Sequence, residues 1–564
     1  MPEDISSVLF DVITDKIGEA RANSDNASLE ALRNDLKIFD GQKSRELEKS
    51  IDLAIRSLPL NRDILPNARG NVNRLARVVP AIPPIGAPAP TVEQTAAIEF
   101  FKNPGTLAIN ALSGTGKTST LLQLARSTKK RGIYLAFNKS IVKDAKIKFP
   151  KNVSCSTIHS IAYREAFRIY RSKSKLNDSV NALKLAETLD LKQKTLENDI
   201  VLEPKHQAFL VLKTLKNFLY STDQELLPSH VHIVGKVVAA AEETRAAVRL
   251  STLELARKTW EQMLEPTNSL PLGHDGYLKR WALGNPKIPG DFILFDEAQD
   301  ANPVILDVLE RVKTRLVLVG DQYQQIYEWR QAVNAMGRIE AQNRCALTRS
   351  FRFGPEIAGL ANRVLTRLGA DQPLIGNPDR RSRVGRVDDP QAVIARTNAG
   401  AISAIVAASK AGRRPCLIGG AKSLLTMIDG VFDLKCGRST RVAEFYGFPD
   451  WEAVVAHAGT PEGEDLAPFV DLIEKWGERY LKVLLKDLPD EQTADVVVST
   501  AHKAKGREWS TVRLSTDFLS ATVEVDGQRQ FPTAELRLLY VAITRAKDAV
   551  EVPEDLLDLI EAGS

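Results

Sequence analysis

The spacing of apolar and polar residues divides the chain into a purely helical first part and a longer part in which strands and helices alternate. In residues 1–78, apolar side chains such as Ile5, Val8 and Leu9 recur at helical spacing, and we expect a helical N-terminal accessory domain there. Residues 79–90 are rich in proline, which suits neither a helix interior nor a central strand. We therefore expect a semi-rigid linker between the two parts.

From Thr91 onward, short apolar runs alternate with stretches of helical periodicity, which favours an α/β fold with parallel sheets. The runs form two sets and predict two sheets: 106–110, 132–137, 292–295 and 316–319, then 392–395, 496–499 and 512–514. Between them, residues 165–289 show no strand pattern, whereas His206–Leu219 and Val234–Val248 have helical periodicity. We interpret this stretch as a helical insertion in the first domain. A looser stretch, 401–493, predicts a smaller insertion in the second.

A glycine-rich turn directly follows the first apolar run. Its residues are Ala111-Leu112-Ser113-Gly114-Thr115-Gly116-Lys117-Thr118, and a helix is expected to begin near Lys117. In a P-loop of this kind, backbone N–H groups converge on the phosphates, the lysine reaches the β- and γ-phosphates, and the hydroxyl of Thr118 holds Mg²⁺. Ala111 stands where the pattern has glycine, so a chance Gly-Lys-Thr turn is the alternative for this motif alone. The turn predicts binding of a nucleoside triphosphate with Mg²⁺.

Two later apolar runs end in polar side chains that would complete a phosphate-hydrolysing site. Asp296 and Glu297 follow the run 292–295; in such a place an aspartate can hold Mg²⁺ and a glutamate can polarise the attacking water. Solvated loop acids are the alternative, but their order after a P-loop favours the catalytic interpretation. Gln325 follows the run 316–319 and is a candidate sensor of the γ-phosphate.

The overall composition is ordinary, and only local features indicate a polynucleotide. The 564 residues are 43% hydrophobic and 26% charged, which suits several globular domains. The net charge of +5 permits a basic groove but does not by itself indicate nucleic acid. Trp329 beside Arg330 is suited to stack on an unpaired base, although core packing is the alternative for Trp329 taken alone.

The cysteines and the hydropathy pattern argue against several other classes. The four cysteines lie far apart without a Cys-x-x-Cys pair, which argues against a zinc site or an iron–sulfur cluster and fits a reduced cytosolic setting. No apolar run is long enough to span a bilayer, and the first residues do not resemble a secretory signal. We expect a cytoplasmic, nucleoid-associated protein if the source is prokaryotic or viral, and a nuclear one if it is eukaryotic.

Taken in order, these motifs carry a family resemblance. The P-loop, Asp296-Glu-Ala-Gln-Asp300 and Gln324-Gln-Ile-Tyr-Glu-Trp329-Arg330 (Gln-x-Ile-Tyr-x-Trp-Arg) resemble superfamily 1A DNA helicases of the UvrD/Rep type, over about Thr91 to Asp548. Phe137-Asn-Lys-Ser-Ile is similar to the F-box DNA helicase branch, although no F-box is recognisable and ubiquitin-ligase function is not expected. The resemblance implies ATP and Mg²⁺ as cofactors and 3′→5′ movement on single-stranded DNA. It also implies binding of single-strand/duplex junctions, in DNA repair, recombination or replication-related processing.

The resemblance implies two RecA-like parallel-sheet motor domains. Together with the strand pattern it divides the chain as follows: 1–78, helical N-terminal accessory domain; 79–90, linker; 91–164 and 290–345, motor domain 1A; 165–289, helical insertion 1B; 346–400 and 494–564, motor domain 2A; 401–493, a reduced 2B-like insertion.

Individual roles follow from the matched motifs. Around the nucleotide, Gln94 resembles the residue that reads adenine and Phe351 the one that stacks on it, while Glu508 lies in the motif linking DNA to nucleotide. Arg352 and Arg545 resemble the arginines that approach the phosphates from the second motor domain. The expected catalytic residues are Lys117, Glu297, Gln325, Arg352 and Arg545. The expected DNA contacts are Phe137, Asn138, Lys139, Thr157, His159, Trp329, Arg330, Thr500 and His502.

One departure from the family pattern leaves alternatives open. Only about 100 residues separate Arg396 from Ser499, so the second insertion must be small, which weakens the expectation of processive unwinding more than that of translocation. One alternative is an ATP-gated nucleic-acid sensor or partner-regulating subunit of a larger complex, for example in defence, with a protein partner bound by the N-terminal domain. Another is a translocase that strips recombination filaments, by analogy with the F-box branch.

Overall fold

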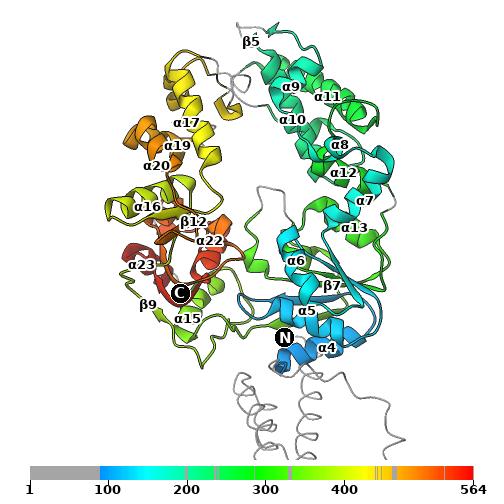
Figure 1. Ribbon diagram of the computed structural model, residues 1–564, viewed down its shortest axis with the longest axis vertical. Helices are drawn as coiled ribbons and strands as arrows, with labels where there is room; N and C mark the ends of the chain where they lie inside the picture. The colour runs from blue at the N-terminus through cyan, green and yellow to red at the C-terminus, as the bar shows by residue number, and fades with distance from the viewer. Residues whose placement is uncertain are drawn as a thin grey trace, which may run out of the picture.

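The computed structural model describes residues 89–562, apart from 197–200, 234–236, 238–239, 285, 328–332, 439, 441, 446–447, 460–465 and 526–527. The expected accessory domain at 1–78 and nearly all of the expected linker at 79–90 therefore lie outside the described residues. Two six-stranded sheets form two lobes that stand side by side, with helices rising above each sheet (Figure 1). None of the helices described is long and apolar enough to cross a membrane.

The first sheet consists of parallel strands in the spatial order β3-β2-β6-β7-β1-β8. Their bounds are β1 Leu107–Ala111, β2 Gly132–Leu135, β3 Val153–Ser156, β6 Phe292–Phe295, β7 Arg315–Gly320 and β8 Asn343–Leu347. The central strands are buried and apolar, as expected where helices cover both faces of a parallel sheet. The edge strands β3 and β8 carry polar residues, which is why the apolar pattern did not predict them.

Helices cover both faces of this sheet. One face packs against α4 (Val92–Lys102), α5 (Lys117–Arg126) and α6 (Lys139–Lys148). The other face packs against α7 (Ile158–Tyr170) and α13 (Pro303–Arg311), and its core continues into the helices inserted between β3 and β6. The insertion therefore shares a core with the first sheet.

The inserted segment is helical, as predicted. After α7 it contains α8 Lys173–Asn177, α9 Ala182–Thr188, the short antiparallel pair β4 Lys194–Thr195 and β5 Val201–Leu202, α10 Pro204–Tyr220, α11 Glu242–Leu264 and α12 Gly273–Leu283. Helix α10 confirms the helix predicted over His206–Leu219. Of the helix predicted over Val234–Val248, α11 covers the part from Glu242 onward, and Glu242 and Glu243 occupy a first turn that favours acidic side chains. Residues 234–236 and 238–239 lie outside the described residues.

The second sheet is also parallel, in the order β11-β12-β10-β13-β16-β9. Its strands are β9 Arg383–Val384, β10 Ala392–Ala395, β11 Pro415–Leu417, β12 Val496–Thr500, β13 Trp509–Leu514 and β16 Ala546–Glu551. One core contains side chains of α15 (Pro355–Arg367), α22 (Thr533–Ile543) and α23 (Glu554–Glu561). A separate core contains side chains of α16 (Asn398–Lys410) and of the helices that follow β11.

Strand β11 lies inside the stretch 401–493, which the sequence pattern treated as an insertion. Helix α16 and β11 belong to the second sheet and its cover, because β11 pairs with β12 along the sheet edge. The part that leaves the sheet begins with α17 and consists of α17 Lys422–Lys435, α18 Trp451–Ala458, α19 Ala467–Trp476 and α20 Glu478–Lys486. In Figure 1 these helices, in yellow and orange, rise above the second sheet and face the insertion of the first lobe.

Candidate nucleotide cleft and polynucleotide face

The glycine-rich turn joins β1 to α5 at the seam between the two lobes. Gly114 and Gly116 have φ angles of 76° and 83°, a backbone region that favours glycine. A Cβ on Gly114 would also lie 2.4 Å from Ser350 Oγ, so a larger residue has no space there. Lys117 begins α5, and its Nζ donates to the Ala111 carbonyl at 2.8 Å, so the ammonium lies over the turn. Thr118 follows it and is exposed.

Strand β6 delivers two acids to the same seam. Asp296 accepts hydrogen bonds from the Tyr134 hydroxyl (2.7 Å) and from the Glu297 backbone N–H (2.9 Å). Burial, followed by the charge of Glu297, raises the pKa of Asp296 to about 6. Burial also works against ionisation of Glu297, but the charges of Lys117 and Lys505 outweigh it and lower the pKa of that carboxyl. Asp296 is buried and the adjacent Glu297 is half-buried, and a divalent cation would neutralise the charge that these two carboxylates bring together. Carboxylate and hydroxyl oxygens are ligands that suit Mg²⁺, so Asp296 and Thr118 fit that ion.

Two arginines from beyond the first sheet reach the P-loop. Arg352 NH1 donates to Ser113 Oγ at 3.1 Å, and Arg545 NH2 donates to the same oxygen at 3.4 Å. Arg545 lies between α22 and β16 of the second lobe and is 2% exposed. Burial and then the charge of Arg352 lower the pKa of Arg545 to about 9. Both guanidinium groups therefore converge on the turn that would hold the phosphates.

Two further side chains at this point were missed by sequence reasoning. The Tyr540 hydroxyl accepts from Ser113 N–H (3.0 Å) and donates to Asp321 Oδ2 (3.1 Å), so it joins the P-loop to the loop after β7. Gln324 accepts from Arg545 at 3.2 Å and donates to Asp321 at 2.6 Å. The sequence offers two adjacent glutamines and we named Gln325, which is also buried. The side chain that contacts Arg545 is that of Gln324, which stands where the Gln-x-Ile-Tyr-x-Trp-Arg pattern has its glutamine.

A buried ion pair closes the seam a short distance away. Lys505 Nζ of the second lobe contacts Asp300 Oδ2 at 2.5 Å and the Gln324 carbonyl at 2.6 Å, and the two charged side chains are 8% and 2% exposed. The same ammonium lies 5.3 Å from the centre of the Tyr327 ring. One cation therefore contacts both acidic and aromatic residues of the first lobe.

The residues expected around the base also lie at the P-loop. A Cβ on Gly116 would lie 3.3 Å from Gln94 Nε2 and 3.3 Å from Phe351 Cε2. The Phe351 ring is 45% exposed. Glu508 accepts a hydrogen bond from Arg352 Nε at 2.8 Å, so it is attached to the arginine that contacts the loop.

Several of the expected polynucleotide contacts meet at Tyr327. Phe137, 45% exposed, stacks on Tyr327 with ring centres 6.1 Å apart and planes 11° apart. The Tyr327 hydroxyl donates to the His502 carbonyl at 3.2 Å, and His502 Nε2 lies 3.0 Å from the Ile326 carbonyl. Phe137 and His502, which come from different lobes, are thus joined through one ring. Trp329 and Arg330 lie outside the described residues.

Three of the expected contacts use their side chains to begin helices. Asn138 Oδ1 accepts from the Ile141 N–H at 2.9 Å at the start of α6. Thr157 accepts from the Ser160 N–H at 3.1 Å at the start of α7, and Thr500 caps the short helix α21 (Ala501–Ala504) in the same way. Each of these side chains has a structural role as a helix N-cap.

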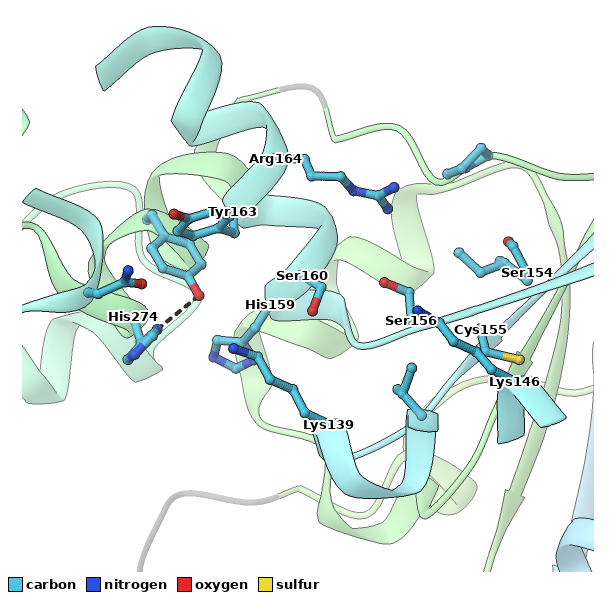
Figure 2. Close-up of a pocket in the computed structure, with 15 residues that line it drawn as sticks. Lys139, Lys146, Ser154, Cys155, Ser156, His159, Ser160, Tyr163, Arg164 and His274 are labelled. Carbon is cyan, nitrogen blue, oxygen red and sulfur yellow. Dashed lines mark hydrogen bonds between the residues drawn. The ribbon is translucent and has the colours of Figure 1, made fainter. Parts of the chain in front are cut away.

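The remaining expected contacts, Lys139 and His159, line a hollow on the first lobe. It has a volume of about 560 Å³ and lies between α6, β3, α7 and α12 (Figure 2). Lys146 and Arg164 line it as well, and Figure 2 shows both cations at its edge. His159 Nε2 lies 3.8 Å from Asp275 Oδ1. Sequence reasoning missed Arg164, because it lies further along α7 than the expected contacts Thr157 and His159 and belongs to no motif itself.

Two parallel-sheet lobes, a P-loop on one of them and an arginine from the other define the class of P-loop nucleotide-dependent motor proteins with paired RecA-like domains. The family described as "UvrD/REP helicase N-terminal domain" matches this chain over residues 91–339. The family described as "UvrD-like helicase C-terminal domain" matches it over residues 495–552. The chain belongs to the UvrD/Rep-type superfamily 1 helicases.

Among the residues described, no group of three or more His, Cys, Asp or Glu side chains forms a metal site.

Two relatives support the same family. The chain is 31% identical to F-box DNA helicase 1 of Gallus gallus over 494 residues, covering 80% of this chain and 48% of the relative. It is 31% identical to F-box DNA helicase protein 1 of Schizosaccharomyces pombe over 522 residues, covering 84% of this chain and 58% of the relative. The chain thus spans about half the length of these relatives.

Proposed function

We propose that this chain is a DNA-stimulated ATPase that moves 3′→5′ along single-stranded DNA and acts in DNA repair, recombination or replication-related processing. The observation that carries the proposal is the contact of Arg352 and Arg545 with Ser113. An arginine presented to the phosphates from a second domain stabilises transition-state charge and makes hydrolysis depend on closure of the cleft. The family and the names of its relatives support DNA as the polymer.

In this proposal the residues of the cleft have separate roles in binding the nucleotide and in hydrolysing it. Lys117 and the backbone of the P-loop hold the triphosphate, while Glu297, kept ionised by Lys117, polarises the attacking water. Thr118 and Asp296 would hold Mg²⁺, which when bound offsets charge on the β- and γ-phosphates. Gln324, rather than the expected Gln325, senses the γ-phosphate in this proposal, because its side chain contacts Arg545 directly.

Movement along DNA requires that binding or hydrolysis of the nucleotide change the contacts between the protein and the polymer. Lys505 contacts Gln324 on the nucleotide side and the Tyr327 ring on the other, and Tyr327 stacks on the exposed ring of Phe137. A shift of the second lobe would therefore move a ring on which a base can stack. Phosphates would follow the cations of the hollow, with little sequence readout. Single-strand/duplex junctions are included among the proposed substrates.

The experiment uses the full-length chain on fluorescently end-labelled single strands and on duplexes with a 3′ or a 5′ single-stranded tail. We expect ATP-dependent arrival at the 5′ end and displacement only of the 3′-tailed duplex, with Lys117→Ala inactive in both assays. Arrival at the 3′ end would contradict the polarity. Absence of DNA-stimulated hydrolysis in the wild type would contradict the function itself.

A second candidate is an ATP-gated nucleic-acid sensor or partner-regulating subunit. The observation in its favour is the small size of the segment that leaves the second sheet, which consists of α17–α20. The same assays separate the two proposals, because robust displacement by the isolated chain disfavours a sensor. DNA-stimulated hydrolysis without movement favours it. A partner bound through residues 1–88 would belong to either proposal.

A further inference from the structure

The side-chain amide of Gln94 is held at both ends by threonines of two helices. Gln94 Oε1 accepts from the Thr91 backbone N–H at 3.1 Å, and Gln94 Nε2 donates to Thr120 Oγ1 at 3.3 Å. Thr91 caps α4, whereas Thr120 lies in α5 behind the P-loop. Gln94 is 4% exposed and Thr120 is fully buried. The amide therefore bridges the start of the first helix and the helix that follows the P-loop.

The chemistry of these partners permits a single orientation of the amide. A backbone N–H only donates, so the amide oxygen must face Thr91. The Thr120 hydroxyl gives its own proton to the Gly116 carbonyl at 3.1 Å, so its oxygen must accept from Gln94. A flipped amide would oppose two donors at Thr91, and at Thr120 it would require the hydroxyl to give up its bond to the Gly116 carbonyl.

The oriented amide borders the space where a base would lie. Gln94 Nε2 and the Phe351 ring approach the same point beside Gly116, and the exposed Phe351 ring offers a flat surface there. The amide keeps one N–H and one oxygen lone pair for a ligand, which match the N7 acceptor and the N6 amino donor of adenine. Guanine has acceptors at both positions and would place its O6 against the amide oxygen.

We propose that Thr120, acting through Gln94, is a positioning residue that makes the cleft prefer adenine over guanine nucleotides. The inference rests on the proposed function, since it requires the P-loop to bind nucleoside triphosphates. Thr120 does not touch the base; it fixes the donor end of the amide that does. It lies three residues after Lys117 at a position that the glycine-rich turn pattern does not specify.

The test compares kcat/KM for MgATP and MgGTP in the full-length chain with saturating single-stranded DNA. Thr120→Val is expected to lower the ATP-over-GTP ratio about 3- to 10-fold, mainly through KM for ATP, because one orienting hydrogen bond is lost. Thr120→Ser keeps the hydroxyl and should restore the ratio. Thr95→Val is the matched control, because the Thr95 hydroxyl donates to the Thr91 carbonyl and is expected to leave the ratio unchanged. An unchanged ratio in Thr120→Val overturns the inference.

A second measurement needs no folded variant. On the wild type, 7-deaza-ATP lacks the N7 acceptor and should have a kcat/KM about 3- to 10-fold below that of ATP. If the wild type uses both equally well, the inference is wrong even where Thr120→Val does not fold. Failure of the proposed function has another signature: no DNA-stimulated hydrolysis of any nucleotide. In that case, competition of ATP and GTP against a fluorescent adenine nucleotide tests the base preference by itself, and equal competition overturns it.

Discussion

At the seam between the lobes, Arg545 and Lys505 are buried and each contacts residues of the other lobe, whereas the cations around the hollow of Figure 2 belong to the first lobe and are exposed. Seam contacts join residues far apart in the sequence, such as Lys505 and Asp300, which are 205 positions apart. Hollow residues such as Lys139 and Arg164 lie close together in the sequence, on two helices that follow one another.

This difference indicates how each region responds to change. A buried cation that loses its partner leaves an uncompensated charge, so the seam should be sensitive to single substitutions. An exposed cation contributes mainly to a summed field, which salt screens and neighbouring residues share. We therefore expect all-or-none effects at the seam and graded effects at the hollow.

The largest expected effect is that of Arg545→Ala. Removing the guanidinium that contacts Ser113 should lower DNA-stimulated kcat about 10³-fold or more, because transition-state charge is no longer offset. Steady-state hydrolysis measures this, and nucleotide binding by fluorescence should change far less. Arg507→Ala is the control, since that exposed side chain pairs with Glu491 at 2.7 Å and only its backbone carbonyl, which alanine keeps, accepts from Arg545. Near-normal turnover in Arg545→Ala would remove Arg545 from the catalytic assignment.

A graded effect is expected for Arg164→Ala at the hollow. Losing one phosphate contact should weaken single-stranded DNA binding about 3- to 10-fold at low salt and reduce the slope of log K against log salt by about one. Titration by fluorescence anisotropy at several salt concentrations measures both. Arg168→Ala is the matched control on the same helix, because Arg168 pairs with Glu165 at 2.9 Å and does not line the hollow. Equal losses in both variants would show that only net charge matters.

The smallest expected effect is at Asn138, where two substitutions distinguish a role as helix N-cap from a direct contact with DNA. Asn138→Ser keeps an N-cap oxygen for the Ile141 N–H and should change DNA affinity by less than about 2-fold. Asn138→Ala should cost about 1 kcal/mol of stability, measured as a lower thermal midpoint. If Ser and Ala weaken DNA binding equally while the thermal midpoint of Ser stays normal, then the side chain acts on the polymer directly.

The sequence predicted the features that depend on the order of neighbouring residues in the chain. Apolar runs marked the central strands of the first sheet and β10, β12 and β13 of the second, because strands covered on both faces tend to be apolar along their length. Strand β16, which lies between β13 and β9, was not predicted, because it carries charged residues. The turn 111–118 was recognisable because a P-loop places its glycines, lysine and threonine at fixed spacing. The edge strands β3 and β8 escaped, since their polar residues match no such run.

What the sequence determined by itself is therefore the α/β class, the two sets of strands, the P-loop and the family. Only the tertiary structure showed that Gln324 contacts Arg545, that Tyr540 joins Ser113 to Asp321, and that Arg164 lines the hollow. Local motifs fix the conformation of a few neighbouring residues through backbone hydrogen bonds and sterics. The direction of a side chain across a seam depends on the packing of two lobes, and no spacing along the chain encodes it.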